Sequence, residues 1–161
     1  MTILGVDPGV ASTGFGIIRV DGDERLELLE EGVIKTEPGT PHNWRLKAIY
    51  EGITELIARH KPDAVAVEGI YFSRNLKSLV EVSEAIGVIT LAAGNRDVGV
   101  KKFTPLEVKS AITGFGRADK LQVQRMVMAM LGLDGTRKAH HASDAIAVAI
   151  CYKNLVCDRG A

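Results

Sequence analysis

The chain has few of the residues that mark secreted, membrane or zinc-finger proteins. Its 161 residues include two cysteines, one Trp, three Tyr and four Phe, and no apolar run reaches the roughly 18 residues of a membrane span. Cys151 and Cys157 match neither a metal-ligand pair nor a redox C-x-x-C motif, so we expect two free thiols. The first residues also lack the basic-then-apolar pattern of a signal peptide. These absences predict a soluble, cytoplasmic protein.

Length and charge bear on the number of domains and on the kind of partner that the protein binds. At 161 residues with 46% apolar composition, we expect one domain over residues 1–161, with the last few residues as a flexible tail. The formal net charge is zero, which argues against a surface that is positively charged all over and binds any polyanion. The charges are uneven, however: residues 21–31 carry six acids and one Arg, and residues 101–138 carry eight Lys or Arg and three acids. The second segment predicts a positive face where phosphates bind.

The hydrophobic pattern predicts the element order βββαβαβααα. Residues with strand character lie in five segments, at 2–7, 14–20, 25–36, 63–69 and 98–103. Helical spacing indicates two longer helices, one that contains 46–57 and ends before Pro62 and one at 75–92. Three more helices follow: a short one from Pro105, another from Asp119 to Gly132, and a last one at 141–156.

This order predicts an α/β fold with a five-stranded mixed sheet. The first three strands have tight turns and form an antiparallel meander, and the last two join by helical crossovers with helices on both faces. A right-handed crossover places strand 63–68 beside and parallel to strand 2–7. In the helix at 75–92 we expect one apolar side, formed by Leu76, Leu79, Val80 and Ile86.

Acidic side chains end both of these parallel strands. Asp7 closes the first and Glu68 the fourth, and ligands bind where parallel strands end in open α/β sheets. His141 and Asp144 are three residues apart and share a helix face, with His140 turned about 100° away. Together these four side chains suit one or two divalent cations, and two such ions stabilise in-line displacement at phosphorus.

Simpler interpretations exist for each acid. Asp7 precedes Pro8-Gly9 and could belong to an ordinary turn, Glu68 could be a solvated strand end, and Asp144 could complement the dipole of its own helix. Each of these is the commoner use of such a residue alone. The metal site is favoured because the predicted topology brings all three acids together.

Four segments resemble the RuvC-type Holliday junction resolvases of bacteria: GVDPGVASTGFGII, AVEGIYFSRN, FTPLEVKSAITGFGRADKLQVQRMV and HHASDAIAVAI. They occur in order along nearly the whole chain. The resemblance implies a ribonuclease-H-like fold, a homodimer, and Mg²⁺- or Mn²⁺-dependent nicking of two strands at a four-way DNA junction, in recombination and repair. It also implies the RuvA–RuvB branch-migration complex as a partner.

The resemblance also assigns roles to individual residues. The family's metal-binding positions match Asp7, Glu68, His141 and Asp144, where many members have Asp in place of His141. Lys109 and Lys120 match basic positions that face the DNA. Tyr71 and Phe72, in a loop that also carries Arg74, match an aromatic position that stacks on an unpaired base. The helix at 75–92 is implied to form part of the dimer interface.

Three other functions stay open at this point. Another ribonuclease-H-like enzyme, acting on RNA–DNA hybrids or RNA, would share the acids. An actin-like or sugar-kinase protein has a similar Asp-x-Gly hairpin, although it needs two such halves and only one is present here. A non-catalytic junction binder is disfavoured because each essential acid is in place.

Overall fold

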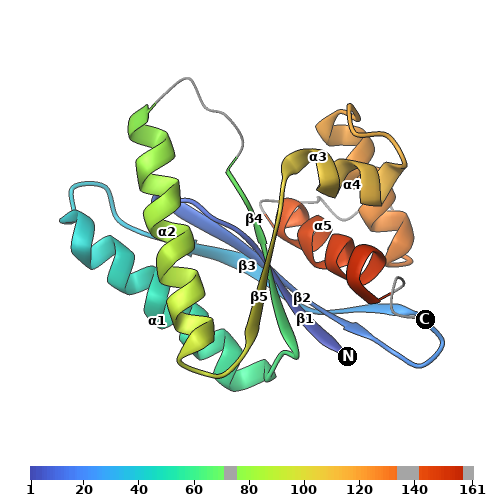
Figure 1. Ribbon diagram of the computed structural model, residues 1–161, viewed down its shortest axis with the longest axis horizontal. Coiled ribbons are helices and arrows are strands. Elements are labelled where there is room, and N and C mark those ends of the chain that lie inside the picture. The colour runs from blue at the N-terminus through green and yellow to red at the C-terminus, as the bar shows by residue number, and fades with distance from the viewer. Residues whose placement is uncertain (71–75, 134–141, 158–161) are drawn as a thin grey trace.

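The computed structural model describes residues 1–70, 76–133 and 142–157, and it contains one five-stranded sheet with helices on both faces (Figure 1). The strands are β1 (Thr2–Asp7), β2 (Ser12–Val20), β3 (Leu26–Lys35), β4 (Ala64–Glu68) and β5 (Gly99–Phe103). The helices are α1 (His42–His60), α2 (Leu76–Gly94), α3 (Pro105–Thr113), α4 (Lys120–Met130), α5 (Ser143–Tyr152) and a π-helical turn, η1 (Lys153–Cys157).

The sheet has the strand order β3-β2-β1-β4-β5, which confirms the predicted mixed topology. The first three strands are antiparallel, and β4 is parallel to both β1 and β5. The register pairs Ile3 with Ala64 and Val6 with Val67. At the other end of these strands, the Asp63 carboxylate accepts a 2.7 Å hydrogen bond from the backbone N–H of Thr2, which helps to fix this register.

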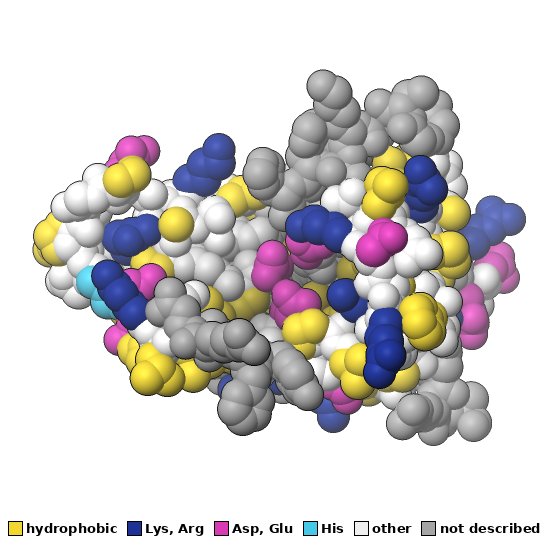
Figure 2. Space-filling model, turned by 90° about the horizontal axis from the view of Figure 1, so that it is seen from above, with side chains coloured by type: hydrophobic (Ala, Val, Ile, Leu, Met, Phe, Trp, Pro, Cys, Tyr) yellow, Lys and Arg dark blue, Asp and Glu magenta, His cyan; other side chains and the backbone are white. Residues whose placement is uncertain are grey.

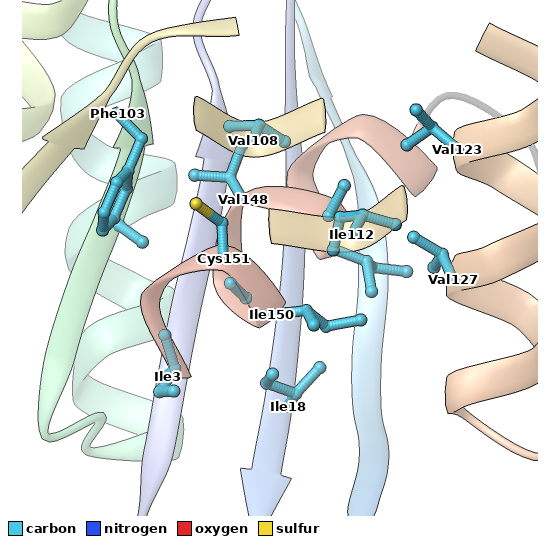
Figure 3. Packing of buried hydrophobic residues seen from close by; sticks show 14 of the residues in the cluster. Ile3, Ile18, Phe103, Val108, Ile112, Val123, Val127, Val148, Ile150 and Cys151 are labelled. Carbon is cyan, nitrogen blue, oxygen red and sulfur yellow. The ribbon is translucent and has the colours of Figure 1, made fainter. Parts of the chain in front are cut away.

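Two apolar layers enclose the sheet. On one face, α1 and α2 pack against it through a core that includes Ile49, Ile53 and Ile89. On the other face, α5 lies directly on β1 and β2, and α3 and α4 pack over α5 (Figure 1). Figure 3 shows the second core, in which side chains from the strands, α5, α3 and α4 meet; they include Ile3, Ile18, Ile150, Cys151, Val108, Ile112, Val123 and Val127.

Glycines in the sheet allow α5 to approach it closely. A Cβ on Gly5 would lie 2.0 Å from the backbone oxygen of Ala145, and one on Gly16 would lie 2.4 Å from Cγ1 of Ile146. Gly5 and Gly16 are cross-strand partners, so they form one side-chain-free patch under the first turn of α5. This close approach holds Asp144, in that same turn, over the end of β1.

Side chains cap the starts of α3 and α4. Thr104 and Glu107 form a capping box at α3, and Asp119 forms one with Gln122 at α4. In each, the capping oxygen accepts the N3 backbone N–H, which satisfies one of the donors left free at a helix start.

Two helices differ in detail from the sequence predictions. The last helix was expected over about 141–156; α5 begins at Ser143 and continues from Lys153 to Cys157 as the π-helical turn η1. Of the expected apolar side of α2, Ile86 is buried, whereas Leu76 and Val80 are 73% and 56% exposed. The core face of α2 is formed by Ala85, Ile86, Ile89, Ala92 and Ala93.

Two expectations from the composition can be compared with the structure. Cys151 and Cys157 are not joined in a disulfide, as predicted, and Cys151 is buried. Within the described ranges, no helix is long and apolar enough to cross a membrane.

Candidate nuclease site

Asp7 and Glu68 lie side by side at the carboxyl ends of the central parallel strands. The register that pairs Val6 with Val67 makes them the next two residues along β1 and β4. Strand ends at this separation, about 4.8 Å, bring their side chains within hydrogen-bonding reach. The two carboxyl groups are hydrogen-bonded to each other, which confirms that the acids converge at this edge of the sheet.

Burial and mutual repulsion raise the pKa values of both carboxyl groups. Loss of hydration raises the pKa of Glu68 to about 7, and the negative charge of Asp7, a hydrogen bond donated to Asp7 and the charge of Asp144 act in the same direction. Burial and Asp144 also raise the pKa of Asp7 above its usual range. Below about pH 7 the pair therefore holds one proton unless positive charge is supplied.

Asp144 lies in the first turn of α5 and is paired with a lysine from α4. Lys120 Nζ donates a 2.6 Å hydrogen bond to Asp144 Oδ2. This hydrogen bond and the charges of Asp144, Asp7 and Glu68 raise the pKa of Lys120. One ammonium group thus interacts electrostatically with three acids from three different elements, and α4 is tied to the site by it.

A chain of hydroxyl groups fixes the loop that follows Asp7, and the sequence analysis did not identify it. Thr13 is fully buried and its hydroxyl donates to the Gly9 carbonyl at 2.8 Å. The Thr36 hydroxyl donates to the Val10 carbonyl at 2.7 Å and accepts from Arg45 of α1 at 2.8 Å. These bonds join β2, β3 and α1 to the loop, so Asp7 sits at the start of a constrained turn.

A second contact steadies the start of α5. Ser143 is 5% exposed, and its hydroxyl accepts a 3.3 Å hydrogen bond from the Gln124 amide of α4. The sequence carries no signal that identifies Thr13 and Ser143. Both residue types are common at exposed turns, so their burial cannot be judged from spacing.

The donor set fits a hard divalent cation. Asp7, Glu68 and Asp144 supply carboxylate oxygens, and the proton shared by the first two marks a position where positive charge is favourable. As their side chains stand, with Asp144 paired to Lys120, no three His, Cys, Asp or Glu residues of the described ranges are grouped closely enough to hold one ion. Cation binding therefore requires Asp144 to exchange Lys120 for the ion.

The remaining predicted residues fall into two groups. Lys109 lies in α3 and is partly exposed, and it is not among the charges that act on Asp7 and Glu68, whereas Lys120 is. The other predicted site residues lie outside the described ranges: Tyr71, Phe72, Arg74 and His141. Their roles stay predictions.

The surface around the strand ends carries both signs of charge. Figure 2 shows acidic side chains gathered near the middle of this face, with Lys and Arg side chains beside them. Such a pattern suits a cation-binding centre within a surface that contacts a polyanion.

Comparison with known proteins identifies the family. The family model described as crossover junction endodeoxyribonuclease RuvC matches residues 3–152. A relative of that name from Pelotomaculum thermopropionicum is 47% identical over 152 residues, covering 94% of this chain and 92% of its own length. Another from Rubrobacter xylanophilus is 46% identical over 150 residues, covering 93% and 83%.

A solved structure agrees with these sequence matches. Thermus thermophilus RuvC in complex with a Holliday junction substrate superposes with a TM-score of 0.89 at 35% identity, covering 96% of this chain and 93% of that one. The fold is therefore ribonuclease-H-like, and the family consists of metal-dependent nucleases. The chain belongs to the RuvC family of crossover junction endodeoxyribonucleases.

Proposed function

We propose that this protein resolves four-way DNA junctions by hydrolysing phosphodiester bonds symmetrically in two strands. The observation that carries the proposal is the meeting of Asp7, Glu68 and Asp144 with Lys120 at the strand ends. Acids that hold a cation and a lysine that faces phosphate are what hydrolysis at phosphorus requires. The relatives named above, and the junction bound to the Thermus protein, support the choice of substrate.

In this proposal Asp7, Glu68, Asp144 and His141 hold one or two Mg²⁺ or Mn²⁺ ions per subunit. Such ions would supply an activated water and charge at the leaving oxygen. The half-buried Asp7–Glu68 pair would bind an ion as two carboxylates, without the proton that the raised pKa values favour in the free protein. Lys120 moves its charge from Asp144 to a phosphate oxygen of the strand.

The DNA-contacting residues surround this centre. Lys109, on α3, neutralises a phosphate of the DNA. Tyr71 and Phe72, in the segment that also carries Arg74, stack on a base at the open centre of the junction. Branch migration is supplied by the RuvA–RuvB complex as a partner. No surface of the described residues is assigned to that partner.

A homodimer supplies the second active site, since a junction has two equivalent strands to cut. Exposed apolar side chains along α2 support this helix as the interface: Leu76, Val80 and Leu91 are 73%, 56% and 57% exposed. Gly87, on the same exposed side, has open space around it and permits close approach of a second helix. A charge in this stripe should separate the subunits. Val80→Glu is expected to sediment as a monomer, whereas Val156→Glu on η1 is the matched control and stays dimeric.

The decisive experiment is incubation with a mobile synthetic junction, a linear duplex and an RNA–DNA hybrid, each with Mg²⁺, Mn²⁺ or a chelator. Paired nicks at symmetric positions, confined to the junction and lost with chelator, are expected. Cleavage of the hybrid in preference to the junction would contradict the proposal.

Three conservative variants test the acids: Asp7→Asn, Glu68→Gln and Asp144→Asn. Each should abolish cleavage and keep junction affinity, because each removes a ligand charge without removing a DNA contact. Calorimetric titration with Mn²⁺ should show a matching loss of metal binding. Loss of junction binding together with cleavage would indicate structural roles instead.

A further inference from the structure

The loop between α3 and α4 presents an exposed phenyl ring. Phe115 is 59% exposed, although the chain has only eight aromatic residues. The Thr113 hydroxyl accepts from the Phe115 N–H at 3.1 Å and lies 3.0 Å from the Phe115 carbonyl, which also accepts from the Ala118 N–H at 3.0 Å. Gly114, in a left-handed conformation with φ of 73°, makes the turn possible. The ring is therefore held at the surface by an ordered loop.

A hollow of about 310 Å³ lies beside this ring. Its walls come from the loop and from the outer side of α4, and its lining residues are Thr113, Phe115, Ala118, Gln122, Arg125 and Met126. Most of the wall is apolar, with the Gln122 amide and the Arg125 guanidinium among its polar groups. A flat aromatic ligand with polar edges matches such a lining.

The hollow belongs to a segment of the chain with net positive charge. From residue 101 to 133 the chain carries six basic residues and two acids. Both acids, Glu107 and Asp119, accept hydrogen bonds from the backbone at the starts of α3 and α4. One of the basic residues, Arg125, lines the hollow itself. An apolar hollow with an arginine in its wall, in a positively charged segment, fits a nucleotide better than an apolar segment of protein.

The hollow and the acidic centre lie on opposite sides of the first turn of α4. Lys120 points from this turn to Asp144 of α5, whereas Gln122 lines the hollow. A helix is about 10 Å across, so one strand can reach both positions within a few nucleotides.

We propose that the hollow beside Phe115 binds an unstacked base of the cleaved strand, within a few nucleotides of the phosphate at Lys120. The inference rests on the proposed function and extends it by a second base-binding position, separate from the Tyr71–Phe72 segment. Phe115 stacks on the base and Arg125 faces its phosphate. The contact fixes which phosphate enters the acidic centre.

Binding is measured with a fluorescent junction in a Glu68→Gln background, which is expected to bind without cutting. Phe115→Ala should weaken binding about 5- to 150-fold, the range for loss of one aromatic stacking contact, and Phe115→Tyr should restore it. Val156→Ala, which removes an exposed apolar side chain on η1, is the control and should bind normally. Thermal unfolding midpoints should stay unchanged in all three.

A second measurement locates the base. With Trp44→Phe removing the single natural tryptophan, Phe115→Trp provides a probe whose emission the junction should quench. A 2-aminopurine a few nucleotides from the cut should respond more than one placed ten nucleotides away. Normal junction affinity of Phe115→Ala, in an enzyme that otherwise cuts junctions, would overturn this inference alone. An enzyme that neither binds nor cuts junctions would overturn the proposed function as well.

Discussion

The Nζ atom of Lys120 lies 2.6 Å from Oδ2 of Asp144, so a cationic side chain occupies the acidic centre of this protein. The pair links the first turns of α4 and α5, and its charge also acts on Asp7 and Glu68. A lysine so placed partly offsets the repulsion among three acids before a divalent ion binds. The same lysine is then available to a phosphate once an ion takes Asp144.

Replacement of Lys120 distinguishes a role in cleavage from a role in stabilising the fold. Lys120→Ala should lower the cleavage rate by roughly 100-fold, since charge at the reacting phosphate typically contributes that much. Stability should fall by no more than about 1 kcal/mol, because the Lys120 side chain is 69% exposed and such ion pairs contribute little. Single-turnover cleavage and urea denaturation measure the two effects.

Lys47→Ala is the matched control for Lys120→Ala. Lys47 forms a comparable exposed ion pair with Glu51, on α1 and away from the acids. Normal cleavage is expected for this variant. A parallel fall in stability and activity in Lys120→Ala would argue against a role at the phosphate.

The raised pKa of Glu68 makes the free energy of unfolding depend on pH. The pKa is about 7 in the folded chain and ordinarily 4.5, so the folded state holds the proton more tightly. This contribution is complete below about pH 4.5 and is lost as the pH rises through about 7. With a chelator present, stability should therefore fall over this interval by on the order of 3 kcal/mol.

Glu68→Gln provides the comparison for the pH experiment. The amide cannot ionise, so urea denaturation of this variant should show a much weaker decrease between pH 5 and about 7.5. A small dependence should remain because the pKa of Asp7 is raised as well. Equal slopes in both proteins would mean that Glu68 is not the titrating group.

The sheet topology could be predicted because its signals are local. Turn residues and strand lengths each occupy a few neighbouring positions, and with simple connection rules they predicted the antiparallel meander of β1, β2 and β3 and the parallel pairing of β4 with β1. Asp7 and Glu68 followed directly, since each ends a strand. The ion pair between Lys120 and Asp144 did not follow, because it depends on how α4 packs on α5.

Burial of individual side chains was harder to predict than topology. The apolar side of the helix at 75–92 could be read from the sequence, but not whether it faces the core; Leu76 and Val80 are exposed, and the core face of α2 consists largely of alanine. Thr13 is fully buried, although threonine is common at exposed positions. In both cases the helix or strand is positioned by distant residues, which spacing along the chain does not reveal.

Gly5 tests whether the close approach of α5 to the sheet positions Asp144. Gly5→Ala would place a Cβ 2.0 Å from the Ala145 oxygen and 2.8 Å from the Ala149 nitrogen, both backbone atoms. Relief requires α5 to move, so the variant should lose about 3 kcal/mol or more and should cleave poorly even where it is folded. Gly22→Ala, with open space around it, should change neither stability nor cleavage.

His141 determines the choice of metal if it ligates the ion as the family resemblance implies. An imidazole is a softer ligand than a carboxylate and tolerates Mn²⁺ well, whereas Mg²⁺ prefers oxygen. His141→Asp should therefore raise Mg²⁺ affinity relative to Mn²⁺ roughly tenfold, as measured by calorimetry without DNA. Its neighbour provides the control, since His140 was predicted to point about 100° away. An unchanged metal ratio in His141→Asp, or the same shift in His140→Asp, would remove His141 from the ligand set and leave Asp7, Glu68 and Asp144 as the proposed ligands.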